Sequence, residues 1–121
     1  MEDLTNIRLS QKASDIAKEL SGEYGFRDAF TFFQFAMSYA LNNHLKEIDF
    51  DTLDSEYDTL GSNYNVGSIK KPGLILTAFK QIFPECTTPY RYVRVLMIYG
   101  TLKIKERLNA GEDFIDIISA G

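Results

Sequence analysis

The chain has 121 residues and a formal net charge of −4, with nine Phe, seven Tyr and a single cysteine. Hydrophobic residues make up 45% of the sequence, which excludes a disordered chain, and the length suits one domain rather than two. One cysteine cannot form an internal disulfide, and no apolar stretch is long enough to cross a bilayer, so we expect a cytoplasmic protein without a membrane partner.

The N-terminal part predicts a short extended segment followed by an amphipathic helix. Residues 6–10 look extended, and Ser10 is suited to cap the N-terminus of a helix. Gly25 is suited to end that helix, because glycine readily adopts the left-handed backbone conformation found after helices. Between them, apolar side chains recur at the spacing of one helix face: Ala13, Ile16, Ala17, Leu20 and Tyr24.

A second helix is predicted from Asp28, another N-cap residue, to about His44. Its apolar residues cover the whole circumference, which is typical of a helix buried on all sides. Two interpretations remain open: a central core helix, or a surface for self-association or for a protein partner. The second interpretation assigns that surface to five aromatic residues: Phe30, Phe32, Phe33, Phe35 and Tyr39.

Residues 46–60 alternate carboxylates with apolar side chains, and we interpret them as an acidic, solvated connection. No 12-residue window in this segment has the oxygen ligands, central glycine and final glutamate of an EF-hand calcium loop. Residues 61–68 are rich in turn-forming residues and predict a loop. They lack the glycine and lysine spacing of a phosphate-binding loop.

Three further helices are predicted in the second half: Gly73–Phe83, Tyr90–Leu108 and Glu112–Ser119. Pro72 suits the first turn of one helix, and Thr88 followed by Pro89 suits the start of the next. Gly100 lies inside the long helix, where glycine costs about 1 kcal/mol relative to alanine, so we expect it to permit close helix packing. These elements predict an all-α fold: a single compact helical bundle of four to five helices with a short extended N-terminal segment, spanning residues 1–121 as one helical domain.

The sequence offers no set of residues for catalysis. His44 is the only histidine, and Cys86 lies between Glu85 and Thr87, where a neighbouring carboxylate does not favour a reactive thiolate. Two such residues cannot complete a zinc site by themselves. We therefore predict that the protein is not an enzyme and that it uses neither a metal nor a cofactor.

The charged residues are unevenly distributed. Residues 1–60 carry five basic and 12 acidic side chains, whereas residues 61–110 carry eight basic and two acidic ones. A local field attracts a polyanion more than the net charge repels it, so this basic segment predicts a surface for phosphates. The alternative is that the two parts neutralise each other within one fold or across an oligomer. The candidate phosphate contacts are Lys70, Lys71, Lys80, Arg91, Arg94, Lys103, Lys105 and Arg107.

Two family resemblances follow from these elements. Residues 7–10, the helix that ends at Gly25 and the apolar helix after it are similar to a ribbon–helix–helix DNA-binding module. A larger part of the chain resembles the DndE family, small helical proteins of bacterial DNA phosphorothioation (sulfur modification) systems. This second resemblance lies in the order and spacing of segments along the chain: residues 7–10, Gly25-Phe26, residues 36–41, Gly61, Gly67, residues 74–81, Arg94, Gly100 and residues 112–118.

The DndE resemblance implies an all-α bundle that assembles into a homo-tetramer and binds the DNA backbone, particularly at nicks. It also implies protein partners in the sulfur-modification complex. Carried over by position, the DNA contacts would be Lys70, Lys71, Arg94, Lys103 and Lys105. We therefore expect a non-catalytic, self-associating protein that binds the DNA backbone. The alternative is a protein–protein adaptor, or a regulator of the ribbon–helix–helix type, with no role in DNA modification.

Overall fold

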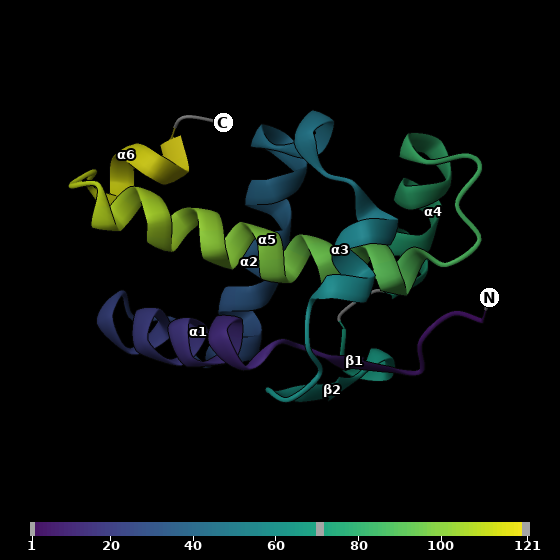
Figure 1. Ribbon diagram of the computed structural model, residues 1–121, viewed down its shortest axis with the longest axis horizontal. Coiled ribbons are helices and arrows are strands. Elements are labelled where there is room, and N and C mark those ends of the chain that lie inside the picture. Colours follow the sequence, from purple (N-terminus) through teal and green to yellow (C-terminus); the bar gives the residue numbers. More distant parts are fainter. Residues whose placement is uncertain (1, 70–71, 120–121) are drawn as a thin grey trace.

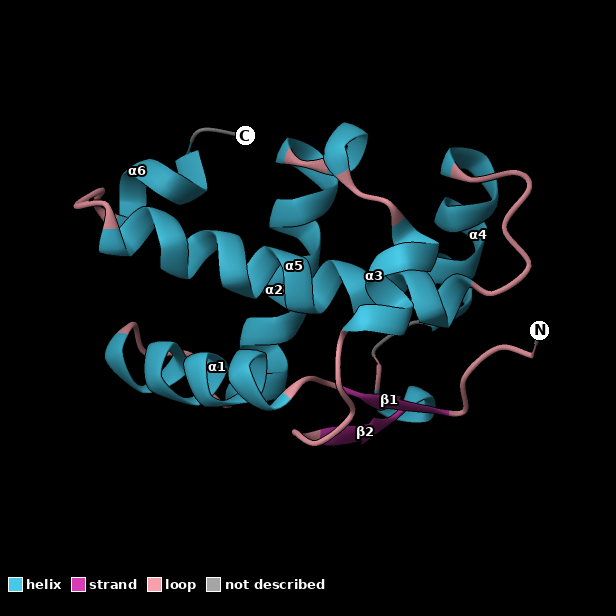
Figure 2. Ribbon diagram, viewed as in Figure 1, coloured by secondary structure: helices cyan, strands magenta, loops and turns pink. Residues whose placement is uncertain are grey.

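The computed structural model describes residues 2–69 and 72–119, which are mostly helical (Figures 1 and 2). In chain order the described elements are β1 (Asn6–Arg8), α1 (Gln11–Glu23), α2 (Ala29–Asn43), the 3₁₀ turn η1 (Leu45–Glu47), α3 (Phe50–Glu56), β2 (Asn63–Asn65), the 3₁₀ turn η2 (Val66–Ser68), α4 (Pro72–Ile82), α5 (Pro89–Asn109) and α6 (Phe114–Ser119). Within this part of the chain, no helix combines the length and apolar character that a bilayer crossing requires.

The predicted caps of the first two helices are confirmed. The Ser10 hydroxyl accepts the Ala13 N–H at 3.2 Å. The Asp28 carboxylate accepts the Thr31 N–H at 2.8 Å, and this bond lowers the pKa of Asp28. Gly25 follows α1 with a φ of 75°, the left-handed conformation expected after a helix end. Local sequence therefore determines where α1 and α2 begin and where α1 ends.

The long helix α5 is the element against which most others pack. It crosses the view of Figure 1 and contacts α1, α2, α3, α6 and β1. Its crossing with α2 is close at Gly100, where an added Cβ atom would lie 2.1 Å from the carbonyl oxygen of Ala36. The expected role of Gly100 in close helix packing is therefore confirmed.

The second helix, α2, is a central core helix, as one of the two interpretations predicted. Phe32 and Phe33 are fully buried and Tyr39 is 4% exposed, so the assignment of these three to a self-association surface is wrong. Phe30 and Phe35 are half-buried against aromatic neighbours from β2, α6 and the α1–α2 connection. Other helices of the same chain, chiefly α5, cover this aromatic helix.

Two features differ from the predicted all-α bundle. Residues 50–56, interpreted as part of a solvated connection, form α3, so the described residues contain six α-helices rather than four or five. The predicted extended segment is the strand β1, and part of the predicted loop 61–68 is its partner β2. The two strands pair antiparallel in the register Asn6↔Asn65, Ile7↔Tyr64 and Arg8↔Asn63. The fold is thus mostly helical with one small two-stranded sheet.

Candidate polyanion-binding pocket

Arg94, on α5, is buried at 3% exposure and donates five hydrogen bonds. Its Nε bonds the Arg8 carbonyl at 2.7 Å, and its Nη1 bonds both the carbonyl and the carboxylate of Asp54 at 3.1 Å. Its Nη2 bonds the carbonyls of Tyr57 and Asp58 at 2.9 and 2.6 Å. These acceptors belong to β1, to α3 and to the segment after α3. Arg94 therefore fastens β1, α3 and the residues that follow α3 to α5.

The five N–H groups of an arginine are all used at Arg94, so none remains for a phosphate. The expectation that Arg94 contacts a phosphate directly does not fit this geometry, and its role is structural. Its positive charge remains, and among the described residues only the Asp54 carboxylate forms an ion pair with it. Burial raises the pKa of the adjacent Tyr57 to about 12, so the phenol stays uncharged at neutral pH.

Arg91 lies one helical turn before Arg94 and is partly exposed. Its Nη1 donates to the Asp54 carboxylate at 3.3 Å, and its Nε donates to the carbonyl of Glu2 at 2.9 Å. Within the described residues no acceptor is bonded to its Nη2. Arg91 thus keeps donors for an incoming anion, whereas Arg94 does not.

A pocket of about 180 Å³ lies where α5 meets β1, and we call it the β1–α5 pocket. Three arginines and one aspartate are among the residues that line it, which gives the pocket an excess of positive charge. The lining residues are Leu4, Asn6, Arg8, Asp54, Thr59, Arg91 and Arg94.

Arg8 is the functional candidate that sequence reasoning missed. In β1 the buried Ile7 is flanked by Asn6 and Arg8, and alternation along a strand directs these two neighbours to the same face. That face is the wall of the β1–α5 pocket. The Arg8 guanidinium makes no hydrogen bond or ion pair with another described residue, so it is free to meet an anion. The alternation of side chains in β1 indicated which face Arg8 is on. It did not indicate that α5 lies beside that face.

The basic residues near the C-terminal end of α5 are paired. Arg107 bonds both carboxylate oxygens of Glu112, at 2.7 and 2.9 Å, and the Tyr39 hydroxyl at 2.9 Å. The bonds from Arg107 lower the pKa of Glu112. Lys103 lies 3.6 Å from the Glu106 carboxylate, one turn along the same helix. Both cations are therefore partly neutralised by nearby acidic groups.

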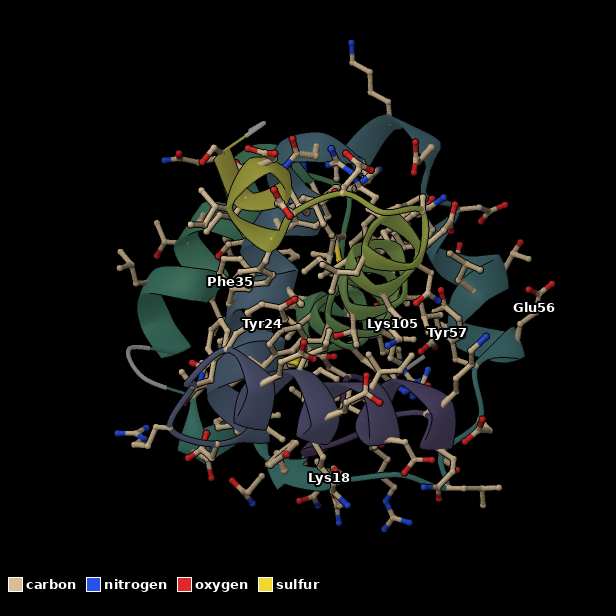
Figure 3. The ribbon with its side chains drawn as sticks, turned by 90° about the vertical axis from the view of Figure 1, so that its left-hand side faces the viewer. Lys18, Tyr24, Phe35, Glu56, Tyr57 and Lys105 are labelled. Carbon is tan, nitrogen blue, oxygen red and sulfur yellow. The ribbon has the colours of Figure 1, made fainter. Side chains whose placement is uncertain are left out.

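The remaining predicted cations are dispersed. Lys105 bonds Glu19 at 2.7 Å, and in Figure 3 it lies between α5 and α1, whereas Lys18 points away from the outer face of α1. Lys80 is exposed on α4. Lys70 and Lys71 lie outside the described residues. For Arg91, Arg94 and Lys105 the predicted alternative holds: each pairs with an acidic residue from the first half of the chain.

The two residues considered for catalysis are not bonded to each other. His44 lies between the Glu47 carboxylate, at 2.7 Å, and the Tyr39 hydroxyl, at 3.1 Å. Tyr99 also bonds Glu47, and this bond lowers the pKa of that carboxyl. Cys86 instead lines a separate cavity beside Lys80. In the described ranges no three His, Cys, Asp or Glu side chains are grouped to hold a metal ion.

An apolar cluster is exposed near the C-terminal end of α5, away from the β1–α5 pocket. Tyr24 and Phe114 stack with ring centroids 4.2 Å apart, where the end of α1 meets α6. Beside them Ile115 is 71% exposed and Ile118 is 39% exposed. Asp113 and Asp116 flank these side chains in the sequence and are exposed. We call Tyr24, Phe114, Ile115 and Ile118 the C-terminal apolar cluster.

Comparison with known proteins finds no family model, no curated protein and no solved structure that matches this chain. Among the described residues, the β1–α5 pocket is the candidate functional site, because three arginines but only one aspartate line it.

Proposed function

We propose that this protein is a non-catalytic, self-associating component of a DNA sulfur-modification system, similar to DndE, and that it binds the DNA backbone. Phosphates are the ligands, and contacts with the backbone alone make the binding independent of base sequence. The β1–α5 pocket is the place on the protein where we expect such a phosphate.

The observation that carries the DNA part of this proposal is the composition of that pocket. Arg8 and Arg91 have guanidinium donors that no described residue occupies, and Arg94 adds a buried positive charge behind them. Asp54 offsets one of the three charges. An arginine fork is well suited to phosphate oxygens, because it can donate two parallel hydrogen bonds.

The residues that carry the DndE resemblance support the proposal in a second way, because several of them hold the fold together. Arg94 fastens β1 and α3 to α5. Gly100 allows α5 to approach α2, and Gly61 allows close approach to the backbone of Ser10, where an added Cβ atom would lie 2.3 Å from a carbonyl oxygen. Residues that a fold needs at fixed spacing are the ones expected to persist between distant relatives.

A protein-binding role is the second candidate, and the C-terminal apolar cluster favours it. Ile115 is mostly exposed to water, and this exposure does not stabilise a monomer. In this alternative the protein is an adaptor, its charges are only solvated, and DNA binding is absent. Self-association through the same cluster is compatible with either function.

An electrophoretic mobility shift with intact and nicked duplexes, at about 50 mM and about 200 mM salt, tests the proposed DNA binding. We expect a shift at micromolar protein that weakens steeply at the higher salt, because phosphate contacts release counterions. The double variant Arg8→Gln/Arg91→Gln should bind about tenfold or more weakly, with a shallower salt dependence. Neither residue fastens the fold as Arg94 does, so the variant should remain folded.

The matched control is Lys18→Gln/Arg27→Gln, which removes the same charge from exposed positions on α1 and the α1–α2 connection. It should retain most of the binding. Absence of any salt-sensitive shift with the unaltered protein would contradict the DNA part of the proposal. An equal loss in both double variants would show that the pocket has no special role. Sedimentation velocity of the unaltered protein tests self-association, and a strict monomer would contradict it.

A further inference from the structure

The N-terminal segment, residues 2–5, lies against the start of α5. The Asp3 carboxylate accepts the backbone N–H groups of Tyr90 and Arg91, at 3.1 and 3.2 Å. Thr88, at the N-cap position of α5, makes no capping bond with its own side chain. A carboxylate distant in the sequence therefore takes the place of the predicted threonine cap.

The same segment also borders the β1–α5 pocket. The Glu2 carbonyl accepts a bond from Arg91 Nε, and Leu4 is one of the residues that line the pocket. The Thr5 carbonyl accepts the Val66 N–H at 3.1 Å, which anchors the segment at its other end. Glu2 and Asp3 are thus held beside the pocket by bonds at both ends of a four-residue segment.

These two carboxylates act on the cations that a phosphate would need. The Asp3 carboxylate accepts the Arg91 N–H, and Glu2, whose carbonyl is bonded to Arg91, adds a second negative charge to the same segment. Neither carboxylate forms an ion pair with another described residue. A phosphate that enters the pocket meets the attraction of the arginines and the repulsion of these carboxylates at once. At low salt the Debye length exceeds about 10 Å, so charges on a segment that is bonded to Arg91 are only partly screened from the pocket.

We infer that the acidic N-terminal segment is an intramolecular competitor that lowers the affinity of the β1–α5 pocket for phosphate. The inference rests on the proposed function and concerns the regulation of the same site. Conditions that neutralise or lift residues 2–5 increase phosphate binding, and conditions that hold the segment in place reduce it. The pocket is therefore set to a weaker affinity than its arginines alone would give.

Two single variants test this inference by fluorescence anisotropy with a labelled DNA duplex. Glu2→Gln removes one charge, and the described contact of Glu2 is kept because it is made by the backbone carbonyl. Asp3→Asn removes the other charge and keeps a side-chain oxygen that can accept from the start of α5. Each variant should bind the duplex about three- to tenfold more tightly at low salt. The gain should shrink at about 200 mM salt, where charges are screened within about 7 Å.

Asp116→Asn is the matched control, because it removes one exposed carboxylate from α6, at the other end of α5. Its affinity should equal that of the unaltered protein, apart from a small effect of net charge. If the unaltered protein binds DNA and both N-terminal variants bind no better than Asp116→Asn, the inference is overturned and the proposed function stands. If neither the unaltered protein nor any variant binds DNA, the proposed function itself fails.

Discussion

Replacing Arg94 with methionine should destabilise the protein by about 3–5 kcal/mol, a large part of the free energy of unfolding of a domain of this size. The variant loses five hydrogen bonds at once and leaves the Asp54 carboxylate without its buried partner. The carbonyls of Arg8, Tyr57 and Asp58 also lose their donor. Urea unfolding followed by circular dichroism measures the loss.

Arg94→Lys should be almost as destabilising, because an ammonium has three donors and cannot reach acceptors on three segments. Arg91→Met is the control: it removes a partly exposed arginine that shares Asp54, and it should cost about 1 kcal/mol or less. A loss at Arg94→Met no greater than that at Arg91→Met would contradict the structural role of Arg94. It would also reopen Arg94 as a direct contact for phosphate.

Gly100→Ala should destabilise the protein by about 2–3 kcal/mol, although alanine is the better helix former. The new methyl group would lie 2.1 Å from the carbonyl oxygen of Ala36 and 2.8 Å from the carbonyl carbon, so α5 and α2 would have to move apart. Backbone atoms cannot rotate away as a side chain can. Thermal or urea unfolding measures the change.

Gly22→Ala is the matched control, because Gly22 is also inside a helix and has open space around the added Cβ atom. There the same substitution should stabilise the protein by about 1 kcal/mol, since only the helix preference changes. Opposite signs at the two glycines are thus expected. A stabilising effect of Gly100→Ala would mean that α2 and α5 do not approach as closely as the structure has them.

Much of the fold follows from local signals. Ser10, Asp28 and Gly25 mark the bounds of α1 and the start of α2 as expected, and Pro89 begins α5. These signals are local because a cap satisfies backbone groups within three or four residues. The pairing of β1 with β2 could not be predicted in the same way. It joins Ile7 to Tyr64, and the partner of a short edge strand is decided by tertiary packing.

The candidate site was only partly predictable. The sequence identified Arg91 and Arg94 as basic residues on one helix, but side-chain type does not reveal whether a cation faces water or buried carbonyls. Arg94 turned inward because three chain segments present acceptors there, two of them from the acidic connection. Arg8 was overlooked because it lies in the acidic half of the chain. The charge of the surrounding sequence did not indicate the role of Arg8, because the fold brings β1 beside α5.

Nuclear magnetic resonance of the arginine Nε–H groups, during titration with a DNA duplex at low salt, shows whether phosphates bind in the β1–α5 pocket. Each guanidinium gives its own signal, so phosphate contacts at the β1–α5 pocket can be located residue by residue. The signals of Arg8 and Arg91 should shift with added DNA and return as salt is raised, while that of Arg27 stays in place. DNA binding that leaves Arg8 and Arg91 unshifted, or no response of any arginine, would contradict the pocket as the phosphate site.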